Sequence, residues 1–201
     1  MTMLQIEKLD ANAAFCCAFG ASTNCLATGK LYSHGGISRC VRRNGLPTSP
    51  VSDLWEFDPH HSAWHLLAKR TKGLSYHRLV SFTAHELATV GGFDGKRRTN
   101  QICVLDIRSS QPAVRTLDIA DFPKGAGMSS HTVYRLDEND QLLVVGRLGG
   151  LKTQRKFASA FLISGDLQRG FHVVDSSEIT VPSISAALHK GKATSLQAIF
   201  R

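Results

Sequence analysis

Long apolar stretches are missing from this sequence. No run of about 18 apolar residues occurs, so we expect no membrane-spanning helix. A secretory signal is missing too, because the first 20 residues have no basic leader and place Glu7 and Asp10 ahead of a short apolar run. The five cysteines are odd in number and show no CxxC pair, which favours free thiols in a reducing compartment. We therefore expect the cytoplasm, with the nucleus as the alternative.

The motifs that mark common catalytic sites are also missing. The sequence contains no GxSxG nucleophile turn, no GxxxxGK phosphate loop followed by serine or threonine, and no HExxH zinc motif. We therefore expect a protein that is not an enzyme and that has no cofactor, no metal ion and no small-molecule substrate.

Short apolar segments recur along the chain and are separated by glycines and polar loops. Gly35, Gly91 and Gly146 each close such a segment, in LYSHGG, LATVGG and LLVVGR, and they lie 56 and 55 residues apart. After each glycine come a polar loop, an aromatic or β-branched segment, a turn and one more short segment. One further apolar segment precedes each glycine-terminated one. The repeat therefore predicts four short strands per unit.

Units of four antiparallel strands that repeat about every 50 residues are typical of β-propeller blades. A blade with two apolar faces needs a neighbour on each side, and a ring of blades supplies them. We predict an N-terminal segment at 1–12 followed by an incomplete propeller at 13–201. Its expected blades are, in order, blade 1 (about 13–67), blade 2 (about 75–117), blade 3 (about 129–175) and a partial blade 4 (about 182–200).

The segment SDLWEFDPHHSAWHLL (52–67) resembles the third strand, aspartate turn and tryptophan-bearing fourth strand of the kelch-repeat family. The pairs Gly35-Gly36 and Gly91-Gly92 are similar to the double glycine of that family. The resemblance implies an all-β propeller that binds a protein partner through loops at one mouth. The third unit departs from the pattern, because Gly146-Arg147 replaces the pair and a loop containing Gly149-Gly150 is expected to follow.

Kelch propellers are usually closed by about six blades, whereas this sequence supplies three blades and part of a fourth. We expect an incomplete product rather than a ring completed by a second chain. Uncovered apolar blade faces recruit other chains. The isolated chain is accordingly expected to be unstable, to aggregate, or to associate into a larger ring.

Two histidines occupy equivalent places in successive units, since His77 lies 14 residues before Gly91 and His131 lies 15 before Gly146. A residue repeated with the blade period is usually a scaffold element, and we prefer this interpretation to a metal-ligand role. Asp58 and Asp106 end the third strands of the first two units, where a carboxylate that initiates a turn is expected.

Basic residues concentrate in loops that should open on one face of the propeller. In a four-stranded antiparallel blade, the loop between the second and third strands lies at the same end as the connection to the next blade. These two loop types carry 15 of the 24 basic residues and three acids, Asp94, Asp118 and Asp121. The second-to-third loops hold ten of them: Arg39, Arg42, Arg43, Lys96, Arg97, Arg98, Arg147, Lys152, Arg155 and Lys156. The connections add Lys69, Arg70, Lys72, Arg78 and Lys124.

Solvated loops usually mix charges of both signs, and these loops do not. Arginine makes bidentate contacts with carboxylates, so we expect the ten loop residues to bind an acidic segment of another protein. Nucleic-acid or anionic-lipid binding through the same face is the alternative. We rank it second because nucleic-acid readers interleave exposed aromatic residues with the charges, and the loops contain only Phe93 and Phe157.

Overall fold

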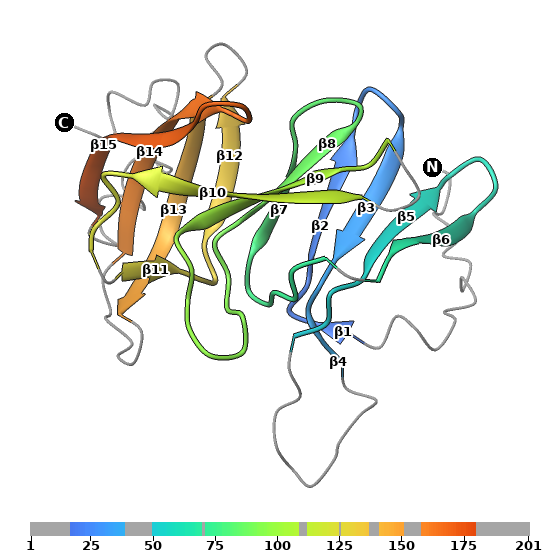
Figure 1. Ribbon diagram of the computed structural model, residues 1–201, viewed down its shortest axis with the longest axis horizontal. Coiled ribbons are helices and arrows are strands. Elements are labelled where there is room, and N and C mark those ends of the chain that lie inside the picture. Colours follow the sequence, from blue (N-terminus) through green and yellow to red (C-terminus); the bar gives the residue numbers. More distant parts are fainter. Residues whose placement is uncertain are drawn as a thin grey trace, which may run out of the picture.

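The computed structural model describes residues 17–38, 50–69, 71–108, 112–124, 126–136, 141–150 and 158–179, and all the regular elements in these ranges are β-strands (Figure 1). Most of the strands form three antiparallel units of four, which we name blades 1, 2 and 3 in chain order. This arrangement confirms the all-β, incomplete propeller. The predicted partial fourth blade lies outside the described residues, and the exact domain limits stay a prediction.

Blade 1 is a separate four-stranded sheet. Its strands pair in the order β2 (Ala21–Cys25), β3 (Lys30–His34), β5 (Leu54–Asp58) and β6 (Ala63–Ala68). A two-stranded pair, β1 (Cys17–Ala18) with β4 (Ile37–Ser38), lies at the end where β2 begins and β3 finishes.

Blade 2 repeats this order with β7 (Arg78–Ser81), β8 (Glu86–Val90), β9 (Gln101–Asp106) and β10 (Ala113–Ala120). Blade 3 consists of β12 (Thr132–Leu136), β13 (Gln141–Gly150), β14 (Ala158–Asp166) and β15 (Gly170–Ile179). A short strand, β11 (Ala126–Met128), pairs with the end of β13. The outer strands β10 and β15 also pair over two residues in parallel, which joins blades 2 and 3 at the rim (Figure 1).

The three inner strands of blade 2 bury side chains on both faces of the sheet. Successive side chains of a strand point to opposite faces. On β7, Leu79 packs into the cluster shared with blade 1, whereas Val80 packs into the cluster shared with blade 3. Leu87 and Ala88 divide in the same way on β8. On β9, Val104 packs toward blade 3 and Leu105 toward blade 1. Because both faces of these strands are buried, the sequence shows apolar runs rather than an alternating pattern.

The glycine pairs let the chain leave the sheet after the second strand of blades 1 and 2. Gly91 and Gly92 have φ values of 60° and 107°, a left-handed region that residues with a Cβ rarely adopt. In blade 3, Arg147 takes the second place of the pair, and β13 continues as a strand to Gly150. The prediction of a loop that contains Gly149-Gly150 is therefore wrong. Those glycines pair with Gly127 and Ala126 of β11.

Candidate functional site

The loop between β8 and β9 and the connections between blades meet at one end of the propeller, as the sequence predicts. Ser75, in the connection to blade 2, exchanges two backbone hydrogen bonds with Phe93 of that loop, at N–O distances of 2.9 and 2.7 Å. On the other side of the loop, the N–H of Met128 donates to the carbonyl of Thr99 at 3.0 Å. We call this end, formed by residues 19–20, 69, 71–77, 91–100, 121–124 and 126–131, the basic mouth. It faces the lower edge of Figure 1.

The ten predicted binding residues divide into three groups. Three of them, Lys96, Arg97 and Arg98, lie in the β8–β9 loop of the basic mouth. Arg147 lies in β13 rather than in a loop. The remaining six lie outside the described residues, and their binding role stays a prediction: Arg39, Arg42, Arg43, Lys152, Arg155 and Lys156.

A tight turn presents Lys96 and Arg97 to solvent. Both of their backbone N–H groups donate to Oδ1 of Asp94 at 2.8 Å. Burial raises the pKa of Asp94, but these backbone hydrogen bonds outweigh it, so the pKa lies below its ordinary value. The Arg97 side chain remains 67% exposed, with its Nε 3.9 Å from Asp94 Oδ2. The carboxylate thus shapes the turn and leaves the cations at its surface.

Two other cations of the basic mouth join neighbouring segments. Arg98 is half-buried and donates from Nε to the hydroxyl of Ser129 at 2.8 Å, in the connection between blades 2 and 3. Lys72 donates from Nζ to Oε1 of Gln101 at 2.7 Å. Arg98 and Lys72 therefore link segments of the basic mouth to each other, whereas the side chains of Lys96 and Arg97 are exposed to solvent.

In each of the three blades, the residue two positions before the first strand has the left-handed backbone conformation. These residues are Phe19, Tyr76 and Ser130, with φ values of 63°, 56° and 54°. Their backbones are linked in series, since the N–H of Tyr76 donates to the carbonyl of Phe19 and the N–H of Ser130 donates to that of Tyr76, each at 2.8 Å. The blades are therefore coupled by a chain of hydrogen bonds across the basic mouth.

Two aromatic side chains of this series stack on each other, which the sequence did not reveal. The ring centroids of Phe19 and Tyr76 are 4.5 Å apart at an interplanar angle of 25°, and Phe19 is 53% exposed. They are 57 positions apart in the chain, so only the repeat register could have indicated their contact. The basic mouth thus contains a stacked aromatic pair with one exposed ring, in addition to Phe93.

Beneath this surface lie three fully buried histidines. His34 Nδ1 is 2.9 Å from His77 Nε2, and His34 Nε2 is 2.7 Å from the hydroxyl of Thr71. Burial lowers the pKa of His34 to about 4 and also lowers that of His131 to about 4; for His131, nearby Arg78 acts in the same direction and the Val90 carbonyl opposes it. Burial likewise holds the pKa of His77 well below its ordinary value. All three are therefore neutral at physiological pH.

His77 and His131 also fill the space left by the glycines, as a scaffold element should. A Cβ on Gly35 would lie 2.9 Å from Cε1 of His77, and a Cβ on Gly91 would lie 2.8 Å from Cε1 of His131. Each histidine thus packs against the glycine of the preceding blade. Within the described ranges, no group of three or more His, Cys, Asp or Glu side chains is placed to hold a metal ion.

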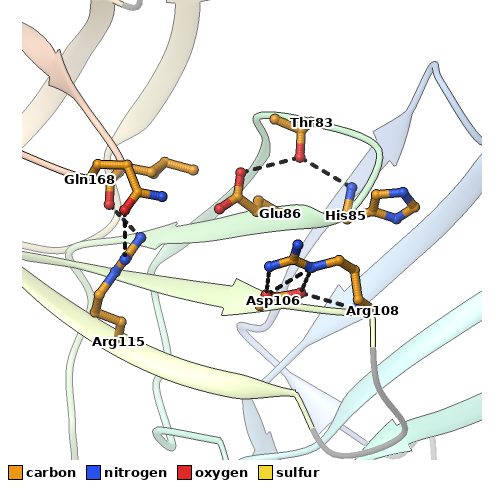
Figure 2. Close-up of polar contacts among 8 residues, drawn as sticks. Thr83, His85, Glu86, Asp106, Arg108, Arg115 and Gln168 are labelled. Carbon is orange, nitrogen blue, oxygen red and sulfur yellow. Dashed lines mark hydrogen bonds and ion pairs between the residues drawn. The ribbon is translucent and has the colours of Figure 1, made fainter.

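At the opposite end of the propeller, an aspartate that ends each third strand caps the next turn. Asp58 accepts the N–H of His60 at 2.8 Å, Asp106 that of Arg108 at 3.1 Å, and Asp166 that of Gln168 at 2.7 Å. These contacts agree with the turn role expected for Asp58 and Asp106. Figure 2 shows Arg108 paired with Asp106, and Arg115 of blade 2 reaching Gln168 of blade 3.

A cavity of about 450 Å³ opens between the first strands of the three blades at this opposite end. The walls come from β2 and β7 with the turns that follow them, and from β12, and include Cys25, Thr83 and Tyr134. Arg135 lies 4.9 Å from the centre of the Phe82 ring and donates to the carbonyl of Ser81. In the part of the chain described here, no helix has the length and apolarity to cross a membrane.

Comparison with known proteins places these features in a family. No family model matches the sequence. Human kelch domain-containing protein 9 is 34% identical over 139 residues, which cover 69% of this chain and 38% of that protein. The mouse protein of the same name is 32% identical over the same length, and mouse kelch-like protein 35 is 32% identical over 75 residues, 35% of this chain and 13% of that protein.

The chain belongs to the kelch-repeat family.

The kelch-repeat assignment agrees with the resemblance seen in the sequence and with the incomplete propeller. The chain spans less than two fifths of the length of kelch domain-containing protein 9, as the 38% coverage shows. The first glycine of each pair has a packing role, because Gly35 leaves space for His77 and Gly91 leaves space for His131 of the next blade. Blade 3 dispenses with the second glycine and extends its strand instead.

Proposed function

We propose that this kelch-repeat chain is a non-enzymatic, cytoplasmic interaction module that binds an acidic segment of another protein at the basic mouth. The observation that carries the proposal is the turn at residues 94–97. It projects Lys96 and Arg97 into solvent, and its own carboxylate is engaged by two backbone N–H groups. An exposed arginine on a turn whose backbone is held in place is suited to bidentate contacts with a carboxylate.

Cations outnumber acids in the described part of the basic mouth. The cations are Lys69, Lys72, Lys96, Arg97, Arg98 and Lys124, and the acids are Asp94 and Asp121. Net positive charge at one end of the molecule attracts acidic partners and steers their association. Nucleic acid and anionic lipid share the negative charge of an acidic peptide and are the alternative partners.

A matched pair of charge reversals tests the proposal. Arg97 and Arg169 each follow an aspartate by three residues, with Nε–Oδ2 distances of 3.9 and 4.0 Å, and in both turns the aspartate accepts two backbone N–H groups. Arg97 lies in the basic mouth, whereas Arg169 lies in the β14–β15 turn at the opposite end. Arg97→Glu and Arg169→Glu therefore change the net charge equally in nearly identical local settings.

Binding is measured by fluorescence anisotropy with a labelled peptide of eight alternating Asp and Glu residues at ~0.15 M salt. We expect Arg97→Glu to weaken binding by roughly threefold to tenfold and Arg169→Glu to leave it unchanged. Affinity purification of partners with the same variants extends the comparison to natural ligands. Equal effects of the two reversals would show that only net charge matters and would refute a binding site at the basic mouth.

A further inference from the structure

We propose that the acidic segment bound at the basic mouth carries an aromatic side chain, which stacks on the exposed face of Phe19. This inference rests on the proposed function and specifies its partner more closely. It follows from the conformation, the exposure and the surroundings of the Phe19–Tyr76 pair.

The backbone does not require an aromatic residue at either position. Phe19, Tyr76 and Ser130 occupy equivalent places, share φ values of 63°, 56° and 54°, and take part in the same series of hydrogen bonds. Ser130 shows that a small side chain is sufficient there. A bulky side chain with positive φ is uncommon and conformationally unfavourable. The aromatic rings of blades 1 and 2 therefore call for an explanation other than the coupling of blades.

One face of Phe19 is available to a ligand. Tyr76 stacks on it at a centroid distance of 4.5 Å, yet Phe19 remains 53% exposed. The hydrogen bond from the N–H of Tyr76 to the carbonyl of Phe19 fixes the two residues relative to each other. A half-exposed ring with a fixed backbone is a preorganised stacking surface, and an aromatic pair contributes to affinity beyond the area that it buries.

A short backbone route joins this ring pair to the cations of the basic mouth. Tyr76 follows Ser75, which pairs with Phe93, and Phe93 precedes the turn that presents Lys96 and Arg97. Lys72 lies four residues before Tyr76 in the same connection. A ligand that lies across the basic mouth thus meets an aromatic surface flanked by positive charge, which is complementary to an aromatic residue among carboxylates.

A nucleic-acid strand would also combine stacking with negative charge. Single-strand binders usually stack successive bases on several aromatic side chains along a groove. The described part of the basic mouth supplies one exposed stack, with one free ring face, so it fits a single aromatic side chain better than a series of bases.

The experiment uses the purified 201-residue chain and two labelled nine-residue peptides. Each has eight alternating Asp and Glu residues around a central position, which is Trp in one peptide and Ala in the other. The variants are Phe19→Ala and, as a matched control, Tyr134→Ala. Tyr134 is 57% exposed, close to the 53% of Phe19, but it lies in β12 and lines the cavity at the opposite end.

We expect the Trp peptide to bind about tenfold more tightly than the Ala peptide, and Phe19→Ala to abolish that difference. Tyr134→Ala should change neither affinity. Unaltered binding of the Ala peptide to Phe19→Ala also shows that the variant is folded. Equal affinities of the native chain for the two peptides, or equal losses for both with Phe19→Ala, would overturn the inference.

Arg97→Glu separates this inference from the proposed function. If it weakens both peptides while Phe19→Ala has no selective effect, the acidic-segment function stands and the aromatic anchor is wrong. If Arg97→Glu weakens neither peptide, the proposed function itself fails. A nine-nucleotide thymidine oligomer that binds more tightly than the Trp peptide at ~0.15 M salt, and loses that affinity in Phe19→Ala, would assign the surface to nucleic acid instead.

Discussion

Nδ1 of His34 in blade 1 lies 2.9 Å from Nε2 of His77, which precedes the first strand of blade 2. The hydroxyl of Thr71 donates to the carbonyl of Ser52, so toward His34 it can only accept, and His34 Nε2 carries the proton. Neutral His34 then accepts at Nδ1 from the Nε2–H of His77. Nδ1 of His77 is left as a buried lone pair with no hydrogen bond. A carbonyl of one blade thus sets the tautomers of two histidines across the interface between blades.

Replacement of His34 should weaken this interface far more than replacement of His131. His34→Leu leaves the Nε2–H of His77 buried without an acceptor, which costs about 1–3 kcal/mol of unfolding free energy. Both ring nitrogens of His131 lack a hydrogen bond of ordinary geometry, so His131→Leu should cost less than about 1 kcal/mol. Urea unfolding at pH 7.5 measures both. A larger loss for His131→Leu would show that the hydrogen-bond series contributes little.

Acid should destabilise the fold between pH 6.5 and pH 4. The folded-state pKa values of His34 and His131 are about 4, below the ordinary value of 6.5, so the unfolded chain takes up protons first as the pH falls. Their stabilising effect is complete well above pH 6.5 and is lost as the pH approaches 4, by about 2 kcal/mol per histidine at pH 5. Urea midpoints at pH 7.5, 6.0 and 5.0 test this.

The variant His131→Leu provides the control, because it should reduce the pH dependence by the share of one histidine. The carboxylates titrate lower: hydrogen bonds from His61 and Arg108 hold the pKa values of Asp58 and Asp106 at about 2. The stability that these two carboxylates contribute is lost only as the pH falls below 3.8, so it does not overlap with the pH range in which the histidines titrate. Midpoints that stay constant from pH 7.5 to 5.0 would contradict the assignment.

Two glycines with the same backbone conformation should respond differently to a methyl group. Gly29 and Gly35 have φ values of 67° and 68°. A Cβ on Gly29 meets no atom within 4 Å, whereas one on Gly35 would clash with the Leu74 carbonyl oxygen and would lie 2.9 Å from Cε1 of His77. Gly29→Ala should cost about 1 kcal/mol for the left-handed conformation alone, and Gly35→Ala about 3 kcal/mol or more. Thermal melts of the pair compare the two losses directly, and equal losses would refute the close contact between blades 1 and 2.

Binding to random-sequence DNA or RNA should be weak and should fall steeply with salt. Each phosphate contact releases condensed counterions, so the logarithm of the affinity decreases linearly with the logarithm of salt concentration. Anisotropy titrations between about 0.05 and 0.3 M salt, a range that brackets physiological ionic strength, measure the slope. Sub-micromolar, sequence-selective binding at physiological salt would reverse our ranking of protein over nucleic acid.

The local pattern of the sequence determined the strands and their grouping. The apolar runs that precede Gly35 and Gly91 form β3 and β8, and the chain leaves the sheet at these glycines. Asp58 and Asp106 cap turns, as their positions predicted. Such features depend on residues that are close in the chain, so they can be read from spacing. The same reasoning failed at Arg147, because pairing of β13 with β11 depends on a segment some 20 residues away.

Only the tertiary structure decided which distant residues meet at the basic mouth. His34 and His77, and Phe19 and Tyr76, are 43 and 57 positions apart, and their contacts depend on how one blade is set against the next. The sequence indicated His77 as a repeated scaffold residue, yet His34 has no counterpart in the other blades and gave no signal. The repeat in the sequence therefore determined the strands of each blade, whereas the packing between blades determined the histidine contact and the aromatic stack at the basic mouth.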